Sequence, residues 1–511
     1  MGKAPIRRGF FAGLIAGAGM LVLMAAARFL WGTPLIPELM AELAFAFIPM
    51  ELFSVGIRLL GKSAKWIAFG LSILGYLSFL GVIGALFAGV RGRLFRPFWD
   101  LLAFSGLLGI GTSTLILLLI SRGTLTPLEV GPAVAIMALV ALHLFYGLFL
   151  GGLLNGGSRE VRRSLTQVPS RGQGERRTLL KGLAGLLALA ALGTASRLLK
   201  PVSARAAQKL DQLFEQVKGI SPEVTPNKQF YKISKNLFDP KVDRKSFRLK
   251  VGGLVERPLE LPIEEIKRMP AVEQYVTLEC ISNEVGGDLM SNALWKGVPL
   301  KHILGLAKVK SQAKRVVFTS YDRYSSSVPI ERALQQNLML VYLMNGEDLP
   351  DDHGGPLRVI YPGHYGMKSP KWLTEIEFVD SEHRGYWESR GWSDEAVIKT
   401  TSRIDTPGSG QTLPTGEVLV GGVALAGDRG MKKVEVSADG GKTWLEAVLK
   451  APLSPYTWVL WAARLRLSKE ENHLLKVRAT DQKGALQEEK PAPPLPEGAT
   501  GYHTVPVQIQ K

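Results

Sequence analysis

The 511-residue sequence contains one cysteine, Cys280. It closes an apolar segment, Tyr275–Cys280, and is followed by a polar, glycine-containing stretch at 281–287. A cysteine at the end of a strand can present a thiolate to a pocket, whereas a structural cysteine usually lies within an element. Free cysteines are nevertheless among the most often buried residues, so a packed structural thiol is the simpler interpretation of these residues alone.

A single cysteine also excludes several kinds of redox centre in this chain. A disulfide framework, a CxxC metal site, a protein-held iron–sulfur cluster and covalent c-type haem all need at least two cysteines. His143 is the one histidine within the apolar N-terminal segments, so a b-type haem held by two histidines is not expected. We therefore expect no haem and no iron–sulfur cluster, and a separate electron carrier, either a quinone or a cytochrome.

The residues around Cys280 have the pattern of a mixed α+β domain at 208–400. Short β-branched segments alternate there with helical stretches at 262–268 and 298–307 and with Gly/Pro turns. The predicted strands are Phe247–Val251, Tyr275–Cys280, Arg315–Tyr321, Leu338–Leu343, Leu357–Tyr361 and Ile376–Val379.

Beyond residue 400 the helical signals stop. Six strand-like segments follow at near-regular spacing, and Asp439-Gly440-Gly441 supplies the positive-φ positions of a tight hairpin. This pattern predicts an immunoglobulin-like β-sandwich at 401–511. Its strands are expected at Glu417–Leu425, Lys432–Ser437, Trp444–Val448, Thr457–Ala462, Leu474–Ala479 and Thr504–Ile509.

The N-terminal part is apolar enough to lie in a membrane. A bilayer core of roughly 30 Å needs about 20 apolar residues in a helix. Segments 9–30, 66–90, 98–121 and 130–152 satisfy this within a helical membrane domain at 1–155, and 178–199 adds a fifth. The segment 35–60 carries charges and prolines, so we interpret it as interfacial or re-entrant, with a sixth full span as the alternative.

The charge distribution predicts an orientation. Of the net charge of +17, +13 falls in residues 1–200, which argues for positive loops on the cytoplasmic side of a membrane and against a nucleic-acid partner. Five spans place the N-terminus and the loops at 91–97 and 153–177 in the cytoplasm. The residues from 200 onward would then lie outside, in a multi-pass protein of the plasma membrane with lipid as a partner.

A basic loop precedes the last apolar segment, within residues 156–207. Arg176-Arg177-Thr178-Leu179-Leu180-Lys181 and the following Ala/Leu run resemble a twin-arginine export signal, with Leu179 where the family prefers Phe. An ordinary positively charged flank is the alternative interpretation. Ala204-Arg205-Ala206 is a small-x-small site, so the segment is either cleaved there or remains as an anchor.

Three separated blocks resemble one enzyme family. Val276–Leu304 is similar to the metal-ligand segment of the sulfite-oxidase-like, molybdopterin-dependent oxidoreductases. Val341–Val379 is similar to the pterin-binding stretch of that family, and the sandwich with Ser437–Trp444 to its C-terminal domain. The resemblance covers roughly residues 225–510 and implies a molybdenum–molybdopterin cofactor. The membrane half lies outside it.

The resemblance implies roles for individual residues. Cys280 matches the thiolate that binds molybdenum, a role that suits a soft ligand, and Asn283 is retained from the segment that follows it. His353 and Arg358 match the pair that holds the pterin phosphate, for which a planar guanidinium is suited. The other implied cofactor contacts are Ser369, Pro370 and Lys371 and, by a looser match, Thr319 and Asn236.

Departures from the family concern the substrate. Glu284 and Val285 stand where sulfite oxidases have arginines, an upstream arginine is missing near Lys232 and Lys235, and Trp392 occupies the position of the catalytic tyrosine. We therefore expect oxygen-atom or two-electron transfer on a small substrate, with a sulfoxide or N-oxide favoured over sulfite. The alternative function is a membrane sensor or transport component whose external domain binds a ligand without turnover.

Overall fold

The computed structural model describes residues 3–48, 63–90, 99–121, 130–155, 212–335, 338–467 and 473–510, with a few isolated positions between them. The chain forms two compact units. One comprises Met1–Met24, Gly75–Gly111 and Ala138–Leu210. The other comprises Ala25–Leu74, Thr112–Met137 and Asp211–Lys511.

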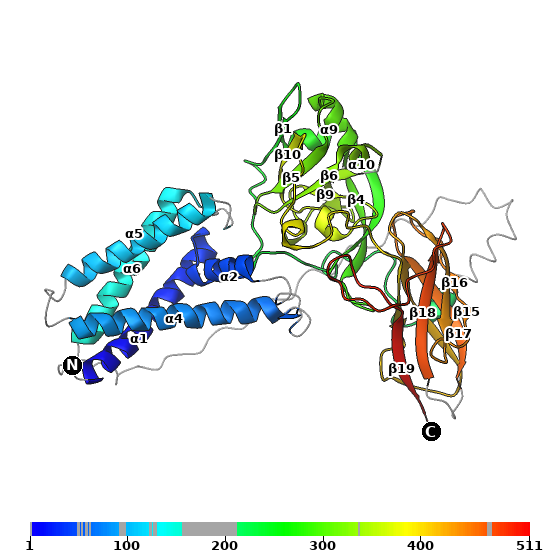
Figure 1. Cartoon of the computed structure of the whole chain (residues 1–511), viewed down its shortest axis with the longest axis horizontal. Helices are drawn as coiled ribbons and strands as arrows, with labels where there is room; N and C mark the ends of the chain where they lie inside the picture. The colour runs from blue at the N-terminus through cyan, green and yellow to red at the C-terminus, as the bar shows by residue number, and fades with distance from the viewer. Residues whose placement is uncertain are drawn as a thin grey trace, which may run out of the picture. The chain divides into compact units, whose positions relative to one another are not determined.

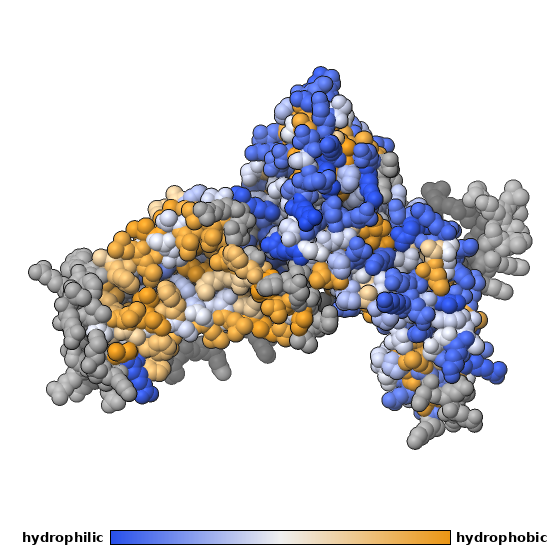
Figure 2. All heavy atoms as spheres, viewed as in Figure 1, coloured by the Kyte–Doolittle hydropathy of each residue, from blue (hydrophilic) through white to orange (hydrophobic). Residues whose placement is uncertain are grey.

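Four described helices are long and apolar enough to cross a membrane: α1 (Lys3–Trp31), α4 (Ala64–Val90), α5 (Trp99–Ser121) and α6 (Pro132–Asn155). Their outward-facing residues are mainly apolar (Figures 1 and 2). The predicted segments at 9–30 and 66–90 fall within α1 and α4, and those at 98–121 and 130–152 begin one or two residues before α5 and α6. The predicted fifth span, the twin-arginine-like sequence and the site at 204–206 lie outside the described residues.

The segment after α1 contains a short helix, α2 (Ile36–Phe47), of 12 residues. At 1.5 Å per residue it is about 18 Å long, too short to cross a hydrocarbon core of roughly 30 Å. Arg28 and Glu38 form an ion pair of 3.0 Å beside it. These features fit an interfacial or re-entrant segment at 35–60 in its described part.

Two features of the helical part follow from small and polar residues. Gly9 and Gly13 of α1 face α4 so closely that a Cβ atom on either would lie 2.5 Å from a carbonyl oxygen there.

His143 is hydrogen-bonded: its Nδ1 lies 2.7 Å from the Leu139 carbonyl oxygen, and its Nε2 lies 3.4 Å from the Tyr76 hydroxyl. The histidine thus has local partners within the helices.

The α+β domain contains two sheets (Figure 1). The first has the order β2-β1-β10-β5-β6, and the second has the order β3-β4-β7-β8, with β9 paired to β7. A core that includes Leu249, Phe318 and Leu340 joins residues of both sheets with those of the helices. The strands are β1 (Arg248–Gly253), β2 (Leu259–Pro262), β3 (Val272–Glu279), β4 (Met290–Pro299), β5 (Arg315–Ser320), β6 (Ser325–Pro329), β7 (Met339–Met344), β8 (Glu347–Asp348), β9 (Arg358–Ile360) and β10 (Leu373–Val379).

Short helices connect these strands. They are α8 (Ile263–Arg268), α9 (Leu300–Ala307) and α10 (Ile330–Gln335), with the 3₁₀ turns η2 (Asp351–His353), η3 (Gly366–Lys368) and η4 (Glu388–Arg390). The predicted strands and helices of this domain match observed elements, whereas β2, β4, β6, β8 and α10 were not predicted. The three 3₁₀ turns matter most for function, because they lie in the segments that surround the candidate site.

The C-terminal domain is a β-sandwich. One sheet has the order β11-β13-β17-β16 and the other β12-β19-β18-β14-β15, with Trp461 fully buried in the core. Gly440 and Gly441 have φ angles of 75° and 101° in the predicted hairpin turn. The strands are β11 (Thr401–Thr406), β12 (Thr412–Leu413), β13 (Gly416–Leu425), β14 (Met431–Ser437), β15 (Leu445–Glu446), β16 (Val448–Leu449), β17 (Val459–Leu467), β18 (His473–Asp481) and β19 (His503–Ile509).

Candidate active site

A cavity of about 620 Å³ opens where β3 ends and the 3₁₀ turns of the α+β domain converge. This volume is in the usual range for a cofactor or small-molecule site. Eight residues expected at the site line the cavity: Cys280, Asn283, His353, Arg358, Ser369, Pro370, Lys371 and Trp392. Residues distant in sequence therefore meet at one pocket.

The loop after β3 holds Cys280 in place. The Cys280 amide donates to the Leu289 carbonyl oxygen at 2.9 Å, which closes the loop. The side chain of Asn283 fixes the loop from within, because its Nδ2 donates to Glu279 Oε1 at 2.9 Å and its Oδ1 accepts from the Leu289 amide at 3.0 Å. Asn283 thus has the contacts of a residue that positions the cysteine.

The thiol itself is suited to bind a soft metal ion. Its Sγ lies 3.0 Å from Ser282 Oγ, and burial raises the pKa of Cys280, while the contact with Ser282 acts in the opposite direction. A partly buried thiol of raised pKa needs a nearby positive charge to become a thiolate, and a bound metal ion provides one. No group of three or more His, Cys, Asp or Glu in metal-binding geometry occurs among the described residues, so protein ligands other than this sulfur are not evident there.

Arg358 lines the same cavity. Its side chain donates to the His353 carbonyl oxygen at 2.9 Å and to the Ser369 carbonyl oxygen at 3.0 Å, and the residue is only 5% exposed. Among the described residues no carboxylate lies within ion-pair distance of this guanidinium. Burial lowers the pKa of Arg358 to about 10.

His353 and Lys371 flank this arginine. The Nε2 of His353 lies 2.9 Å from the Asn227 carbonyl oxygen, and burial lowers the pKa of His353 to about 4, so the ring is neutral near pH 7. Lys371 donates to the Asp352 carbonyl oxygen at 3.0 Å and lies 3.9 Å from Asp239. Burial lowers its pKa to about 8.

These groups fit a molybdenum–pterin cofactor. A buried cation without a carboxylate partner is costly unless an anion binds it, and a phosphate satisfies a guanidinium well. Arg358, with His353 and Lys371 beside it, would hold that phosphate, and Ser369 and Pro370 would line its approach. Cys280, in the same cavity, would ligate the metal.

Trp392 lines the cavity and is 8% exposed, and its indole Nε1 has no hydrogen-bond partner within the described part of the chain. A buried N–H without a partner costs free energy, so a ligand that accepts from it is favoured there. Glu284 also lines the cavity. Val285 is not among the lining residues, and it packs instead toward Gly501.

Two expected cofactor contacts do not reach the cavity. Thr319 lies on β5 between β6 and β10 and is not among the lining residues. Asn236 is set back from it, with its Nδ2 donating to Asp322 Oδ2 at 2.8 Å, and Asp322 is the residue that lines the cavity. The match of these two positions to the family was the loosest, and the structure offers no cofactor contact for them.

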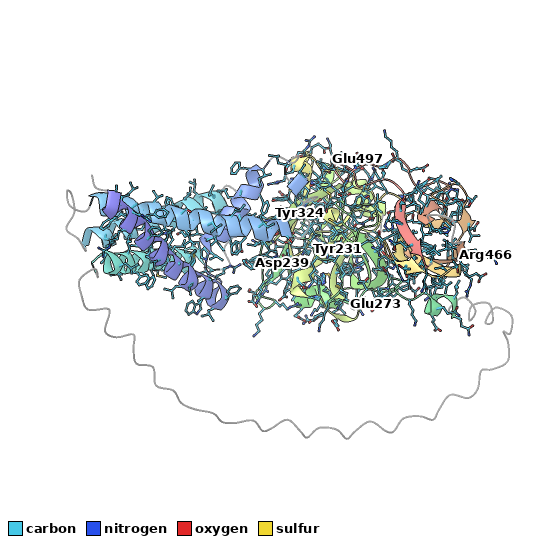
Figure 3. The ribbon with its side chains drawn as sticks, turned by 90° about the horizontal axis from the view of Figure 1, so that it is seen from below. Tyr231, Asp239, Glu273, Tyr324, Arg466 and Glu497 are labelled. Carbon is cyan, nitrogen blue, oxygen red and sulfur yellow. The ribbon has the colours of Figure 1, made fainter. Side chains whose placement is uncertain are left out.

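Several aromatic and basic lining residues were not predicted from the sequence, among them Tyr231, Tyr324, Tyr386 and Arg390. Figure 3 labels Tyr231 and Tyr324 within the α+β domain. The Tyr324 hydroxyl donates to the Met367 carbonyl oxygen at 2.6 Å, and the Arg390 guanidinium lies 3.7 Å from the centre of the Tyr386 ring. No motif marks them, because their position depends on how η3 and η4 fold back on the sheets.

The lysines near the missing arginine position are both paired. Lys232 forms an ion pair with Asp352. Lys235 is nearly buried and lies 3.8 Å from both Glu42 and Asp322. Their charges are therefore largely compensated by carboxylates, and Arg390 and Lys65 are further lining cations that the sequence did not indicate.

Residues of the β-sandwich contact the loop that follows Cys280. Arg403 of β11 donates to the Gly287 carbonyl oxygen at 2.7 Å. Gly286 has a φ of 77°, and a Cβ atom there would lie 2.2 Å from the ring of His503 of β19. Only glycine combines this backbone conformation with so close an approach.

Comparison with known proteins agrees with this geometry. Residues 236–387 match the family model "Oxidoreductase molybdopterin binding domain", and residues 395–509 match "Mo-co oxidoreductase dimerisation domain". The crystal structure of the sulfane dehydrogenase SoxCD from Paracoccus pantotrophus is similar over 57% of this chain and 82% of that chain, with a TM-score of 0.51 and 24% identity, which shows a shared fold.

Curated relatives include sulfite oxidases. Sulfite oxidase of Arabidopsis thaliana is 30% identical over 53% of this chain and 84% of its own length. The mitochondrial sulfite oxidase of Rattus norvegicus is also 30% identical, over 53% of this chain, but the match spans only 58% of the rat protein. Nitrate reductase [NADH] 1 of Oryza sativa subsp. japonica is 29% identical over 49% of this chain and 34% of its own length. The chain belongs to the sulfite-oxidase-like family of molybdopterin-dependent oxidoreductases.

Proposed function

We propose that this chain is a membrane-anchored reductase of neutral oxo compounds, such as sulfoxides or N-oxides, outside the cytoplasmic membrane. One observation carries the proposal: a single cavity is lined by both the lone thiol of Cys280 and the buried guanidinium of Arg358. The molybdenum–pterin group, when bound, supplies the two-electron redox chemistry. The residues of the chain bind, orient and select the substrate.

The lining residues support a neutral substrate. The Trp392 indole provides an apolar wall and an N–H donor for the oxygen of a sulfoxide or N-oxide. A carboxylate such as Glu284 at about 4–6 Å from a bound sulfite dianion would cost on the order of 1–4 kcal/mol per unit charge. Arg390 offsets part of this repulsion, but its face is occupied by Tyr386, and Lys235 is compensated by Glu42 and Asp322.

Two experiments test the metal site. Purified chain should contain about one molybdenum atom, and Cys280→Ser should lose turnover while its unfolding transition stays close to that of the unaltered protein. Ser282→Ala is the matched control and should retain the metal. A Cys280→Ser variant with full activity would contradict the assignment, and a chain that binds no molybdenum would favour the alternative of a ligand-binding sensor.

The substrate class is tested separately. We expect kcat/KM to be higher for methyl sulfoxides and amine N-oxides than for sulfite, with each assayed against a dye couple under matched conditions. Each 1.4 kcal/mol of lost binding is a tenfold loss of affinity, so sulfite should be weaker by about one order of magnitude or more. A kcat/KM for sulfite above the kcat/KM of every organic oxide would refute the interpretation of Glu284 and Trp392.

The location of the site is also a proposal. It depends on the excess of lysine and arginine in the N-terminal loops and on the fifth apolar segment at 178–199. Reporter fusions after residues 95, 165 and 210 should give cytoplasmic, cytoplasmic and external signals. An external signal at 165 would reverse the topology.

A further inference from the structure

One wall of the active-site cavity is formed by residues outside the α+β domain. Phe45 and Ile48, at the end of α2, and Ala64 and Lys65, at the beginning of α4, line the cavity together with Tyr386 and Trp387. All of these residues belong to the same compact unit as the cysteine loop. The family match begins at residue 236, so this wall is an addition to the family's domain.

The contact that creates this wall has several components. Lys65 Nζ donates to the carbonyl oxygen of Ser234 and, at 2.9 Å, to that of Asn236. The ring of Phe238 packs edge-on against Phe29, Trp66 and Phe69, with ring centres 5.9–6.1 Å apart. Aromatic pairs of this geometry add to the stabilisation from burial. The segment 234–238 is therefore anchored to helices whose other surfaces are apolar.

The composition of this wall indicates what kind of molecule it admits. α4 is one of the candidate membrane spans, so the cavity is lined by the first residues of a helix that is long and apolar enough to cross a bilayer. Phe45 and Ile48 are apolar, and they share the cavity with the aromatic rings of Tyr386 and Trp387. A flat, lipid-soluble ring fits such a wall, because its members other than Lys65 are apolar or aromatic. Lys65 has three N–H donors and uses two on the described carbonyls, so one is available to a carbonyl oxygen of the ring.

We propose that the wall of Phe45, Ile48 and Lys65 binds the head group of a membrane quinol, which is the direct electron donor of the site. This inference depends on the proposed function. The overall reaction is balanced. The quinol loses two electrons and two protons and becomes a quinone. The oxo compound takes up these two electrons and two protons, and its oxygen leaves as water. No further protein carrier is needed for these electrons.

The test uses the full-length, molybdenum-containing protein in detergent with a photoreactive azidoquinone. After illumination, peptides containing residues 45–48 or 386–392 should carry the label. Phe45→Ser should reduce the labelling at least fivefold. Phe47→Ser is the matched control, because Phe47 lies on the same helix, is 74% exposed and does not line the cavity, and it should be labelled like the unaltered protein.

The outcomes separate this inference from the proposed function. Labelling at other segments only, an equal loss in Phe45→Ser and Phe47→Ser, or displacement of the label by phospholipid as readily as by unlabelled quinone would overturn the quinol site. Cys280→Ser should keep the label, since the wall does not include the sulfur. The ratio of quinol-driven to dye-driven sulfoxide reduction should fall at least fivefold in Phe45→Ser. Absence of molybdenum would refute the function, whereas dye-driven turnover without quinone labelling would refute this inference alone.

Discussion

Lys368 Nζ lies 2.7 Å from Glu388 Oε1, and both side chains are 1% exposed. The ammonium also lies 3.1 Å from Asp394, which in turn pairs with Arg315 at 3.0 Å. This buried network connects η3, η4 and β5. It therefore fixes the segment that carries Tyr386, Arg390 and Trp392 to the cavity.

Removing the cation from this network should be strongly destabilising. Lys368→Met leaves Glu388 buried without its partner, and breaking such a pair costs about 3–5 kcal/mol. Glu388→Gln should cost less, because Lys368 keeps Asp394 and the amide oxygen can still accept from Ser326. Denaturant unfolding of both variants gives the comparison. A Lys368→Met protein as stable as Glu388→Gln would show that the network does not hold the segment.

Trp392→Phe should lower kcat/KM for a sulfoxide by roughly 2- to 10-fold, because one neutral hydrogen bond contributes about 0.5–1.5 kcal/mol. Phenylalanine retains the apolar wall but has no N–H. Trp387→Phe is the control at a neighbouring lining position and should have a smaller effect. If both variants behave alike in steady-state assays, the Trp392 N–H does not bind the substrate.

The stability of the protein should decrease as the pH falls from about 6.5 toward 4. Burial lowers the pKa of His364 to about 4, so the folded state holds this ring neutral while the unfolded chain binds a proton at higher pH. The ring stacks on Tyr361 at 3.8 Å and does not line the cavity. His364→Gln should flatten the pH dependence of the unfolding free energy in this interval. An unchanged slope in the variant would assign the effect to other groups.

Gly286→Ala should destabilise the protein and weaken metal binding. A positive φ costs a residue with a Cβ atom roughly 1–2 kcal/mol, and here the added atom also meets His503. Gly484→Ala is matched in conformation, with a φ of 87°, but it faces open space. The difference between the two variants in thermal unfolding therefore isolates the contact with β19. Equal losses would indicate that the loop can move away from His503.

Much of the site could be predicted because its chemistry is local in sequence. Cys280 follows a strand directly, and His353 and Arg358 are five residues apart, so short motifs place them. Tyr324, Tyr386 and Arg390 could not be found in this way, since their approach to the cavity depends on long-range packing of η3 and η4. The strand β4 was missed because Asn292, Lys296 and Gly297 interrupt its apolar pattern, although Asn292 is fully buried between protein partners.

The membrane part was predictable for a different reason. Length and apolarity alone indicate helices that can span a bilayer, and charges in 35–60 argue against a full span there. Sequence patterns do not reveal that Phe45 and Lys65 line the cavity, because such proximity arises only in the folded chain. The same limit applies to Glu42 and Lys235, whose pairing explains why this lysine does not supply a free charge to the site.

The contacts of the cysteine loop with Arg403 and His503 can form only late in the synthesis of the chain. The ribosome completes the α+β domain, including the proposed phosphate contacts His353, Arg358 and Lys371, well before it adds β19. At that stage the Gly286–Gly287 end of the loop with Cys280 lacks its contacts with the side chains of Arg403 and His503. The contacts of the loop that carries the proposed metal ligand are therefore complete only after the last strand of the sandwich has been made.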